Sequence, residues 1–543
     1  MKLHVASIVL ALSTLAGCVS SGPWSERELG SFHLAASTKS AEAQRWFDQG
    51  LVMCYGFDQE LAREAFAAAA QADPSFAMAY WGQAYAFGPH INNPAMDEES
   101  SRIAHEASQK AVALAESATP LERDLIAALS KRYAWPPPQD RRELDVAYAD
   151  AMRGVWQAHG DSDDAGALFA EALMDLRPWD LWSSEGEPRP ETPEVISTLE
   201  SVLARTPNHP GAMHYYVHTM EASRTPERAL DAANLLRDRV PGASHLVHMP
   251  SHIDIRLGRY VEAIEANRRA TLADAVRIER AGAGGFYAIY RAHNFHFLMW
   301  AAMFDGQRET AMRAARDVTQ QIPMEVVRAM PEFVEGFLGS PYHVMVRFGM
   351  WNEILAEPAP AEDLYGTTAM WRYSRALAFA SLDRVDEAVA ERAAFEAACE
   401  RVPESYLMGN NSVRTVLAIA REMVAGEVEF RRGNHEQAFE HLREAVKQDD
   451  ALRYDEPWGW VQPARHALGA LLLERGRVDE AESVYRRDLE RHPRNGWALH
   501  GLAECLRRTK RNGDAELVEK QFLETWMRSD VQLRGSCFCR RRD

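Results

Sequence analysis

The sequence predicts an all-α fold, an α-solenoid in which helix pairs stack along the chain. Three observations predict it. Small and aromatic residues recur with a period near 34 residues. No sustained apolar–polar alternation or Asn-Gly hairpin indicates strands. The loops are short and rich in Pro and Gly, as in "WPPPQDR" and "LAEPAPAED". A chain of 543 residues is too long for one compact globule, whereas an array accommodates it.

The repeat spacing is that of tetratricopeptide units, each a pair of helices. Its small residues allow two helices to approach closely, and its proline ends the second helix. The clearest units lie near the two ends of the chain: Gly50, Ala62, Phe66, Ala69 and Pro74; Gly426, Ala438, Leu442 and Ala445; and Gly469, Ala481, Tyr485 and Pro493, followed by Leu502, Leu506 and Ala515.

The N-terminus predicts export. Residues 1–17 carry a basic Lys2 and a short apolar run, which is typical of a signal peptide and too short to span a bilayer. The ending Leu-Ala-Gly-Cys resembles a bacterial lipobox, in which Cys18 is lipidated and becomes the mature N-terminus. Residues 18–42 then form the anchor and a tether. Because Val19 and not Asp follows the cysteine, the resemblance implies an outer-membrane lipoprotein facing the periplasm.

The helical array is predicted to run from residue 43 to 530, and residues 531–543 form a short tail. The tail contains Cys537 and Cys539 in "SCFC". This pair is open to three interpretations: a soft-metal ligand pair, a redox pair, or a tail without such a role.

Histidines crowd the middle of the chain in three helical stripes. Residues three and four apart share one face of a helix, so each stripe presents its imidazoles together. The stripes comprise His214, His218 and Glu221; His245, His248 and His252; and His293 and His296.

The predicted fold brings these stripes near one another. Each precedes a segment that matches the second helix of a unit, so each falls on a first helix, which in such arrays lines the concave groove. Neighbouring helices pack about 8–10 Å apart. Imidazoles on adjacent first helices are then able to meet around one ion.

Histidine is the commonest metal ligand and a carboxylate its usual companion, so we expect a metal centre. One ion needs three or four ligands, and the set exceeds that number. Two ions, or one ion beside catalytic histidines, are therefore both open. We expect the ligands to be His214, His218, His248 and His252, followed by His245, His293 and His296, with Glu221 as ligand or general base. Nitrogen ligands suit Zn, Cu or Fe without choosing between them.

The net charge of the chain is −18 at pH 7, which argues against a nucleic-acid partner, because binding to phosphate groups needs a basic surface.

Several segments resemble a group of exported bacterial tetratricopeptide proteins with histidine-rich helices. They are "YGF", "FAMAYWGQAYAFGP", "HPGAMHYYVHTMEAS", "HLVHMPSHIDIRLGRY", "AHNFHFL" and "SCFC". The resemblance runs along nearly the whole mature chain. It implies the helical array and no particular reaction.

Two functions remain open from the sequence. The first is a lipid-anchored tetratricopeptide protein with a histidine-built metal centre in its groove, used for metal handling or for catalysis with Glu221 as the base. The second is a metal-free scaffold whose groove binds a peptide or a partner protein. The first is favoured because a scaffold groove does not need so many histidines in register.

Overall fold

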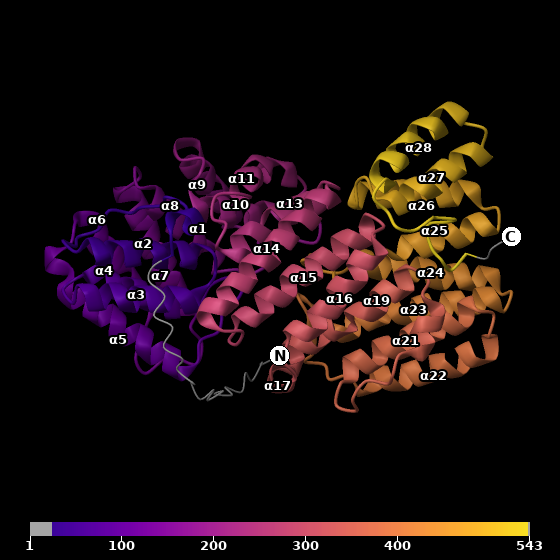
Figure 1. Cartoon of the computed structure of the whole chain (residues 1–543), viewed down its shortest axis with the longest axis horizontal. Helices are drawn as coiled ribbons and strands as arrows, with labels where there is room; N and C mark the ends of the chain where they lie inside the picture. The colour runs from indigo at the N-terminus through magenta and orange to yellow at the C-terminus, as the bar shows by residue number, and fades with distance from the viewer. Residues whose placement is uncertain (1–23, 541–543) are drawn as a thin grey trace. The chain divides into compact units, whose positions relative to one another are not determined.

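The computed structural model describes residues 24–540. The predicted signal peptide and Cys18 lie outside these residues. The regular secondary structure of the described residues is almost entirely helical, with one two-stranded hairpin at Leu407–Met408 and Asn411–Ser412 (Figure 1). The all-α prediction is confirmed. None of the helices between residues 24 and 540 combines the length and the apolar composition that a bilayer span requires.

The chain divides into two compact units. The first comprises residues 24–253 and 269–287, and the second comprises residues 254–268 and 288–540. The division falls inside α13 (Pro250–Arg256) and α14 (Tyr260–Ala281), and after the first residue of α15 (Tyr287–Phe304).

The first unit consists of consecutive helices. They are α1 (Glu26–Leu29), α2 (Ala41–Tyr55), α3 (Gln59–Ala72), α4 (Ala77–Phe87), α5 (Glu98–Leu114), η1 (Ala115–Ser117), α6 (Pro120–Leu129), η2 (Ser130–Arg132), α7 (Arg142–Ala158), α8 (Asp163–Met174), α9 (Thr192–Arg205), α10 (Pro210–Glu221), η3 (Pro226–Ala229), α11 (Leu230–Leu236) and α12 (Ser244–His248).

The second unit continues in the same manner. Its further helices are α16 (Arg308–Gln321), α17 (Met324–Ala329), α18 (Pro331–Val334), η4 (Glu335–Gly339), α19 (Ser340–Arg347), α20 (Trp351–Ala356), α21 (Tyr365–Ser381), α22 (Val385–Arg401), α23 (Val413–Arg431), α24 (His435–Asp450), α25 (Ala464–Glu474), α26 (Val478–Arg491), α27 (Gly496–Arg508) and α28 (Asn512–Trp526).

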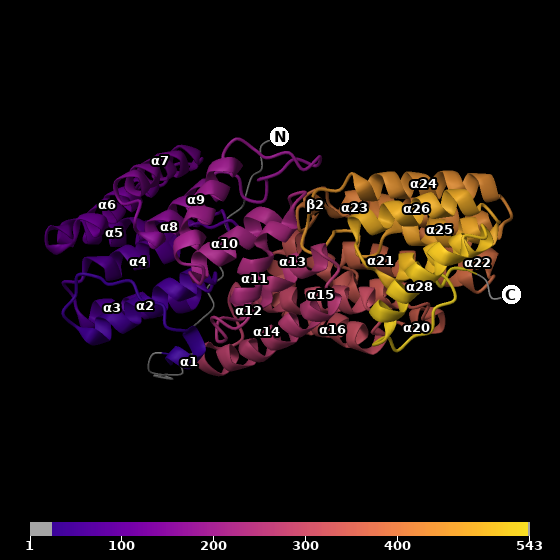
Figure 2. The same ribbon diagram turned by 90° about the horizontal axis from the view of Figure 1, so that it is seen from above.

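The small residues of the repeat pattern lie where helices touch. In the first unit, α2, α3 and α4 lie side by side in both views (Figures 1 and 2), and the ring of Phe66 on α3 lies between Gly50 and Gly82. A Cβ at Gly50 would be 2.7 Å from that ring. In the second unit the ring of Tyr485 on α26 lies between Gly469 and Gly501. The chain is therefore a solenoid of tetratricopeptide-type helix pairs, as the spacing predicts.

Candidate functional site

The candidate site of the first unit is built around α10, and every residue of this helix is buried. Pro210 occupies the first turn, and the His209 side chain caps the helix by accepting a hydrogen bond from the Ala212 N–H at 3.1 Å. A helix buried on all sides packs against neighbours all round. These neighbours include α2, α8, α9 and α11.

Three histidines meet beside α10. His214 and His218 come from α10 and His245 from α12, and each offers one ligand atom within 4.8 Å of the other two. Their ring centroids are 4.8 Å apart for His214–His218 and 4.9 Å for His214–His245. All three are at most 5% exposed. The structure therefore brings together three of the predicted ligands.

The His214 ring is oriented by the main chain of α2. Its Nδ1 donates to the carbonyl oxygen of Tyr55 at 2.5 Å. This bond leaves the lone pair on Nε2, which is buried and has no hydrogen-bond partner. Burial, reinforced by His218, holds the pKa of His214 well below its usual value. His214 is therefore neutral, the state that a metal ligand requires.

Tyr55 is itself held firmly. Its hydroxyl donates to Asp164 on α8 at 2.6 Å, and the same carboxylate oxygen lies 3.2 Å from His209 Nε2. Its ring contacts Gly211, where a Cβ would be 2.5 Å away. The start of α10 and the end of α2 are thus fixed together, and this contact places the Tyr55 carbonyl opposite His214.

Glu221 links two histidines. Its Oε1 lies 2.7 Å from His218 Nδ1, and its Oε2 lies 2.7 Å from His252 Nδ1. Burial alone would raise the pKa of Glu221, but His252 and His218 together hold it well below its usual value. Glu221 is thus an ionised acceptor for both rings. An Nδ1–H donated to Glu221 leaves the lone pair of His218 on Nε2.

The remaining histidines of the second stripe form a pair. His252 Nε2 lies 2.7 Å from His248 Nε2, so one of these nitrogens carries the proton between them. His248 Nδ1 lies 3.4 Å from the Ser251 hydroxyl. His248 is the last residue of α12, and His252 lies on α13, which begins at Pro250.

Aromatic rings enclose the three-histidine cluster. The Phe57 ring centroid lies 4.5 Å from that of His214 and 5.6 Å from that of His245, and Trp179 contacts His218 edge-on at 5.4 Å. His90 stacks on the Phe57 ring at 4.7 Å. Burial lowers the pKa of His90 to about 3. The cluster therefore has an apolar wall, and the neutral imidazole of His90 lies behind the Phe57 ring.

Phe57 adopts a left-handed backbone conformation, with φ of +56°. Such a conformation costs about 1–2 kcal/mol for a residue with a Cβ. The left-handed residue lies in the short turn between α2 and α3, because Asp58, the next residue, already caps α3. Local strain of this kind gathers at sites where a side chain must be aimed, and here it aims the ring at the histidines.

The second unit contains the other two predicted ligands. His293 Nε2 lies 3.8 Å from a carboxylate oxygen of Glu456, and its ring contacts Phe297. His296 contacts Phe337 edge-on. Burial, with a smaller contribution from His343, lowers the pKa of His296 to about 3.

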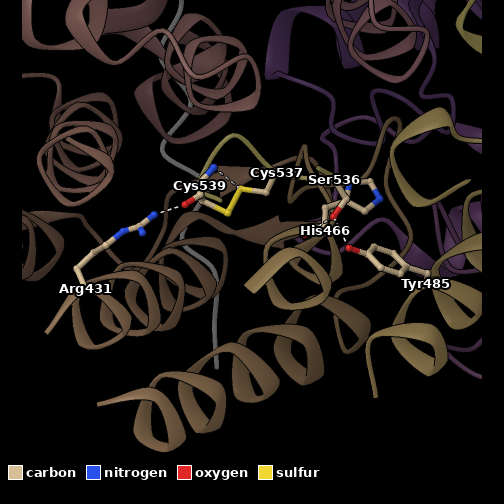
Figure 3. Close-up of a disulfide and its surroundings, with 6 residues drawn as sticks. All are labelled: Arg431, His466, Tyr485, Ser536, Cys537 and Cys539. Atoms are coloured by element: carbon tan, nitrogen blue, oxygen red, sulfur yellow. Dashed lines mark hydrogen bonds between the residues drawn. A yellow bond between two sulfur atoms is a disulfide. The ribbon is translucent and has the colours of Figure 1, made fainter. Parts of the chain in front are cut away.

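Cys537 and Cys539 form a disulfide in the second unit (Figure 3). The structure therefore contains this cysteine pair in its oxidised state, and the three interpretations of the pair stay predictions. The other cysteines of the described residues, Cys54, Cys399 and Cys505, are free and buried.

The sequence pattern did not single out Tyr55, Phe57, Asp164 or His209 as members of the site. "YGF" is the one local signal for the first two, because Gly56 followed by an aromatic residue ends α2. Nothing local indicates Asp164, which reaches the site only through packing of α8.

Comparison with known proteins does not assign the chain to a family. No protein-family model matches the chain, and no curated protein matches it significantly in sequence. Among solved structures, similarity extends to a human IFIT1 dimer with m7Gppp-AAAA, with 11% identity and a TM-score of 0.35 over 90% of this chain and 91% of that one.

It also extends to a Rap protein complexed with competence and sporulation factor, with 10% identity and a TM-score of 0.31 over 67% of this chain and 98% of that one. Yeast Tom70 has 12% identity and a TM-score of 0.29 over 90% of both chains. These scores are low, so the fold assignment rests on the helix packing of the chain itself.

Proposed function

We propose that the first unit binds a metal ion through His214, His218 and His245. The observation that carries this proposal is the approach of three buried imidazoles to within 4.8 Å, with His214 oriented through Nδ1 by Tyr55. Ligating histidines generally donate their other N–H to a carbonyl or carboxylate. His214 and His218 both meet this criterion, through Tyr55 and Glu221.

The chemistry of the donor set fits a borderline first-row ion. Imidazole suits Zn, Cu or Fe, and three protein ligands leave a fourth tetrahedral position for water or substrate. An ion with bonds of about 2.1 Å holds its ligands about 3.4 Å apart, so side-chain shifts of about 1 Å close the cluster. When bound there, such an ion would act as a Lewis acid or, for Cu or Fe, support oxidation.

In this proposal Glu221 is the orienting carboxylate. It fixes the tautomer of His218 and couples that ring to His252 and, beyond it, His248. Its two oxygens are both engaged by imidazoles, which favours orientation over the general-base role open from the sequence. His248 and His252 then lie next to the ligands as a hydrogen-bonded pair of imidazoles.

The N-terminal sequence, with its signal-like residues 1–17 and Cys18, supports a membrane-anchored location for the protein. Cys18 carries a lipid after removal of residues 1–17, and the two helical units are held at a bacterial membrane facing the periplasm. Replacing Cys18 with Ala in the full precursor is expected to release the protein from the membrane fraction. Retention of the variant in that fraction contradicts the anchor and leaves the metal proposal unaffected.

The metal centre is tested on the chain from Ser20 onward, purified without chelators or added histidine tags. Elemental analysis is expected to find Zn, Cu or Fe near one ion per chain, and the H214A/H218A variant is expected to lose it. A matched control is H33A/H159A, which removes two histidines outside the cluster, paired with Asp48 and Asp124. The control is expected to keep the metal.

No bound metal in the wild type, even after loading with each ion, overturns the proposal. The remaining function is then the scaffold, in which the array binds a peptide or protein partner. Metal retained by H214A/H218A places it elsewhere and equally contradicts the assignment.

A further inference from the structure

The C-terminal cysteine pair is held firmly against the second unit. Ser536 donates to the carbonyl oxygen of His466 and accepts from the Tyr485 hydroxyl, both at 2.7 Å (Figure 3). On the other side, Arg431 donates to the carbonyl oxygen of Cys539. Arg540 forms two bonds to Glu504, at 2.6 and 3.0 Å. The backbone on both sides of the disulfide is thus anchored independently of the S–S bond.

A buried carboxylate lies beside the two sulfurs. Glu427, on α23, is 2% exposed, and its Oε2 has no hydrogen-bond partner. One of its oxygens and the Sγ atoms of Cys537 and Cys539 all lie within 4.8 Å of one another. A buried carboxylate oxygen without a partner is unfavourable, and native structures contain few of them. Burial raises the pKa of Glu427 to about 7, and its position makes it a third donor beside the two sulfurs once the disulfide is opened.

A small cavity joins these groups. It has a volume of 20 Å³ and is lined by both cysteines, Glu427 and the thioether-bearing Met423, among others. This is enough for about one water molecule or one ion and too little for an organic ligand. The cavity therefore restricts the ligand to a single small species.

We propose that reduction of the disulfide creates a Cu(I) site formed by Cys537, Cys539 and Glu427. A dithiol reductant supplies two electrons and two protons, so the S–S bond becomes two thiols while the reductant becomes a disulfide. Binding of Cu(I) then displaces the two thiol protons to solvent and forms two Cu–S bonds. Reoxidation by a disulfide reverses these steps and releases the ion.

The sulfur donors favour a soft ion. Thiolate and thioether sulfur prefer Cu(I), and Met423 adds a thioether to the lining of the same cavity. Two thiolates and Glu427 give the site excess negative charge, which the guanidinium of Arg431 on the same helix offsets from the Cys539 side. The site is separate from the histidine cluster in its residues, its ligand chemistry and its dependence on redox state.

The test uses the chain from Ser20 with H214A/H218A, so that the histidine cluster contributes no ion. The protein is prepared in its oxidised form and after anaerobic reduction by a dithiol that is then removed. Three thiols are expected in the oxidised form and five after reduction. Cu(I) is then titrated while thiolate-to-copper charge-transfer absorption and bound copper are measured.

The reduced form is expected to bind one more Cu(I) per chain than the oxidised form. Single variants C537S and C539S are expected to lose this ion, and E427Q to bind it more weakly. C505A removes a buried thiol outside the site and is the matched control, which keeps the ion. Circular dichroism of each variant verifies the helical fold.

Equal copper binding by the oxidised and reduced forms overturns the proposal, as does retention of the ion by C537S. The same titration with Zn²⁺ distinguishes a general thiolate site from a Cu(I) site. Stronger binding of Zn²⁺ than of Cu(I) contradicts the assignment of the ion.

Discussion

His214 donates its Nδ1 proton to the carbonyl oxygen of Tyr55 at 2.5 Å, across 159 residues of chain. This one bond fixes both the tautomer and the ring plane of His214. It also makes the histidine cluster dependent on the end of α2, where Tyr55, Gly56 and Phe57 turn the chain toward α3.

Replacing Glu221 with Gln tests the orienting carboxylate. The amide is uncharged and accepts through one atom, so it cannot hold both His218 and His252 as the ionised carboxylate does. We expect metal affinity to fall about 10–100-fold with the fold retained. Competition with a chromophoric chelator measures the affinity. E227Q, at an exposed position, is the control, and equal affinity in the two variants would count against the role of Glu221.

Position 57 tests the strained turn. Phe57 is 2% exposed, so F57A is expected to lower the free energy of unfolding by about 3–5 kcal/mol. F57G removes the same ring but accepts the positive φ without penalty, so we expect it to be about 1 kcal/mol more stable than F57A. Denaturant titration measures both. An alanine variant at least as stable as the glycine variant would show that the turn is unstrained.

Gly469 tests the close helix contacts of the repeat. A Cβ there would lie 2.5 Å from the Tyr485 ring, so G469A is expected to destabilise the protein by about 1–3 kcal/mol. The matched control is G154A on α7, where a Cβ meets nothing within 4 Å. There we expect a gain of about 0.5–1 kcal/mol. Thermal unfolding of both variants checks the opposite signs, and a shared sign would refute the packing argument.

His343 tests the pH dependence of stability. Burial lowers the pKa of His343 from 6.5 to about 4. Between these two pH values His343 is therefore protonated in the unfolded chain and neutral in the folded protein. The contribution of His343 to stability is therefore complete above pH 6.5 and falls by about 1.4 kcal/mol per pH unit below it. H343F abolishes this titration. The stability of the wild type relative to H343F is expected to decrease by about 2 kcal/mol from pH 7 to pH 5.

The stability of H343F is subtracted from that of the wild type at each pH, because other buried groups make the stability change with pH in the opposite direction. Burial raises the pKa of Asp455 to about 8, so its contribution decreases as the pH rises. Subtracting the variant from the wild type cancels that contribution. A difference that does not change with pH would mean that His343 is accessible to protons in the folded protein.

The sequence by itself determined the helical array and the histidine stripes. Helix pairing is encoded locally, since Gly50, Gly469 and their aromatic partners recur at fixed spacing and lie in contact in the structure. The neighbouring positions of His214 and His218 follow equally from helical periodicity. Such patterns depend on fixed separations along the chain, and they can be detected without knowledge of the packing.

Only the tertiary structure decided which histidines meet and what orients them. It groups His245 with His214 and His218, and it joins His252 to Glu221. It also joins Cys537 to Cys539 beside Glu427. These contacts depend on the angles at which helices distant in sequence pack, and on the end of α12 at His248, separated by one residue from the start of α13 at Pro250. No local pattern records those angles, because they result from the sum of side-chain contacts over the whole unit.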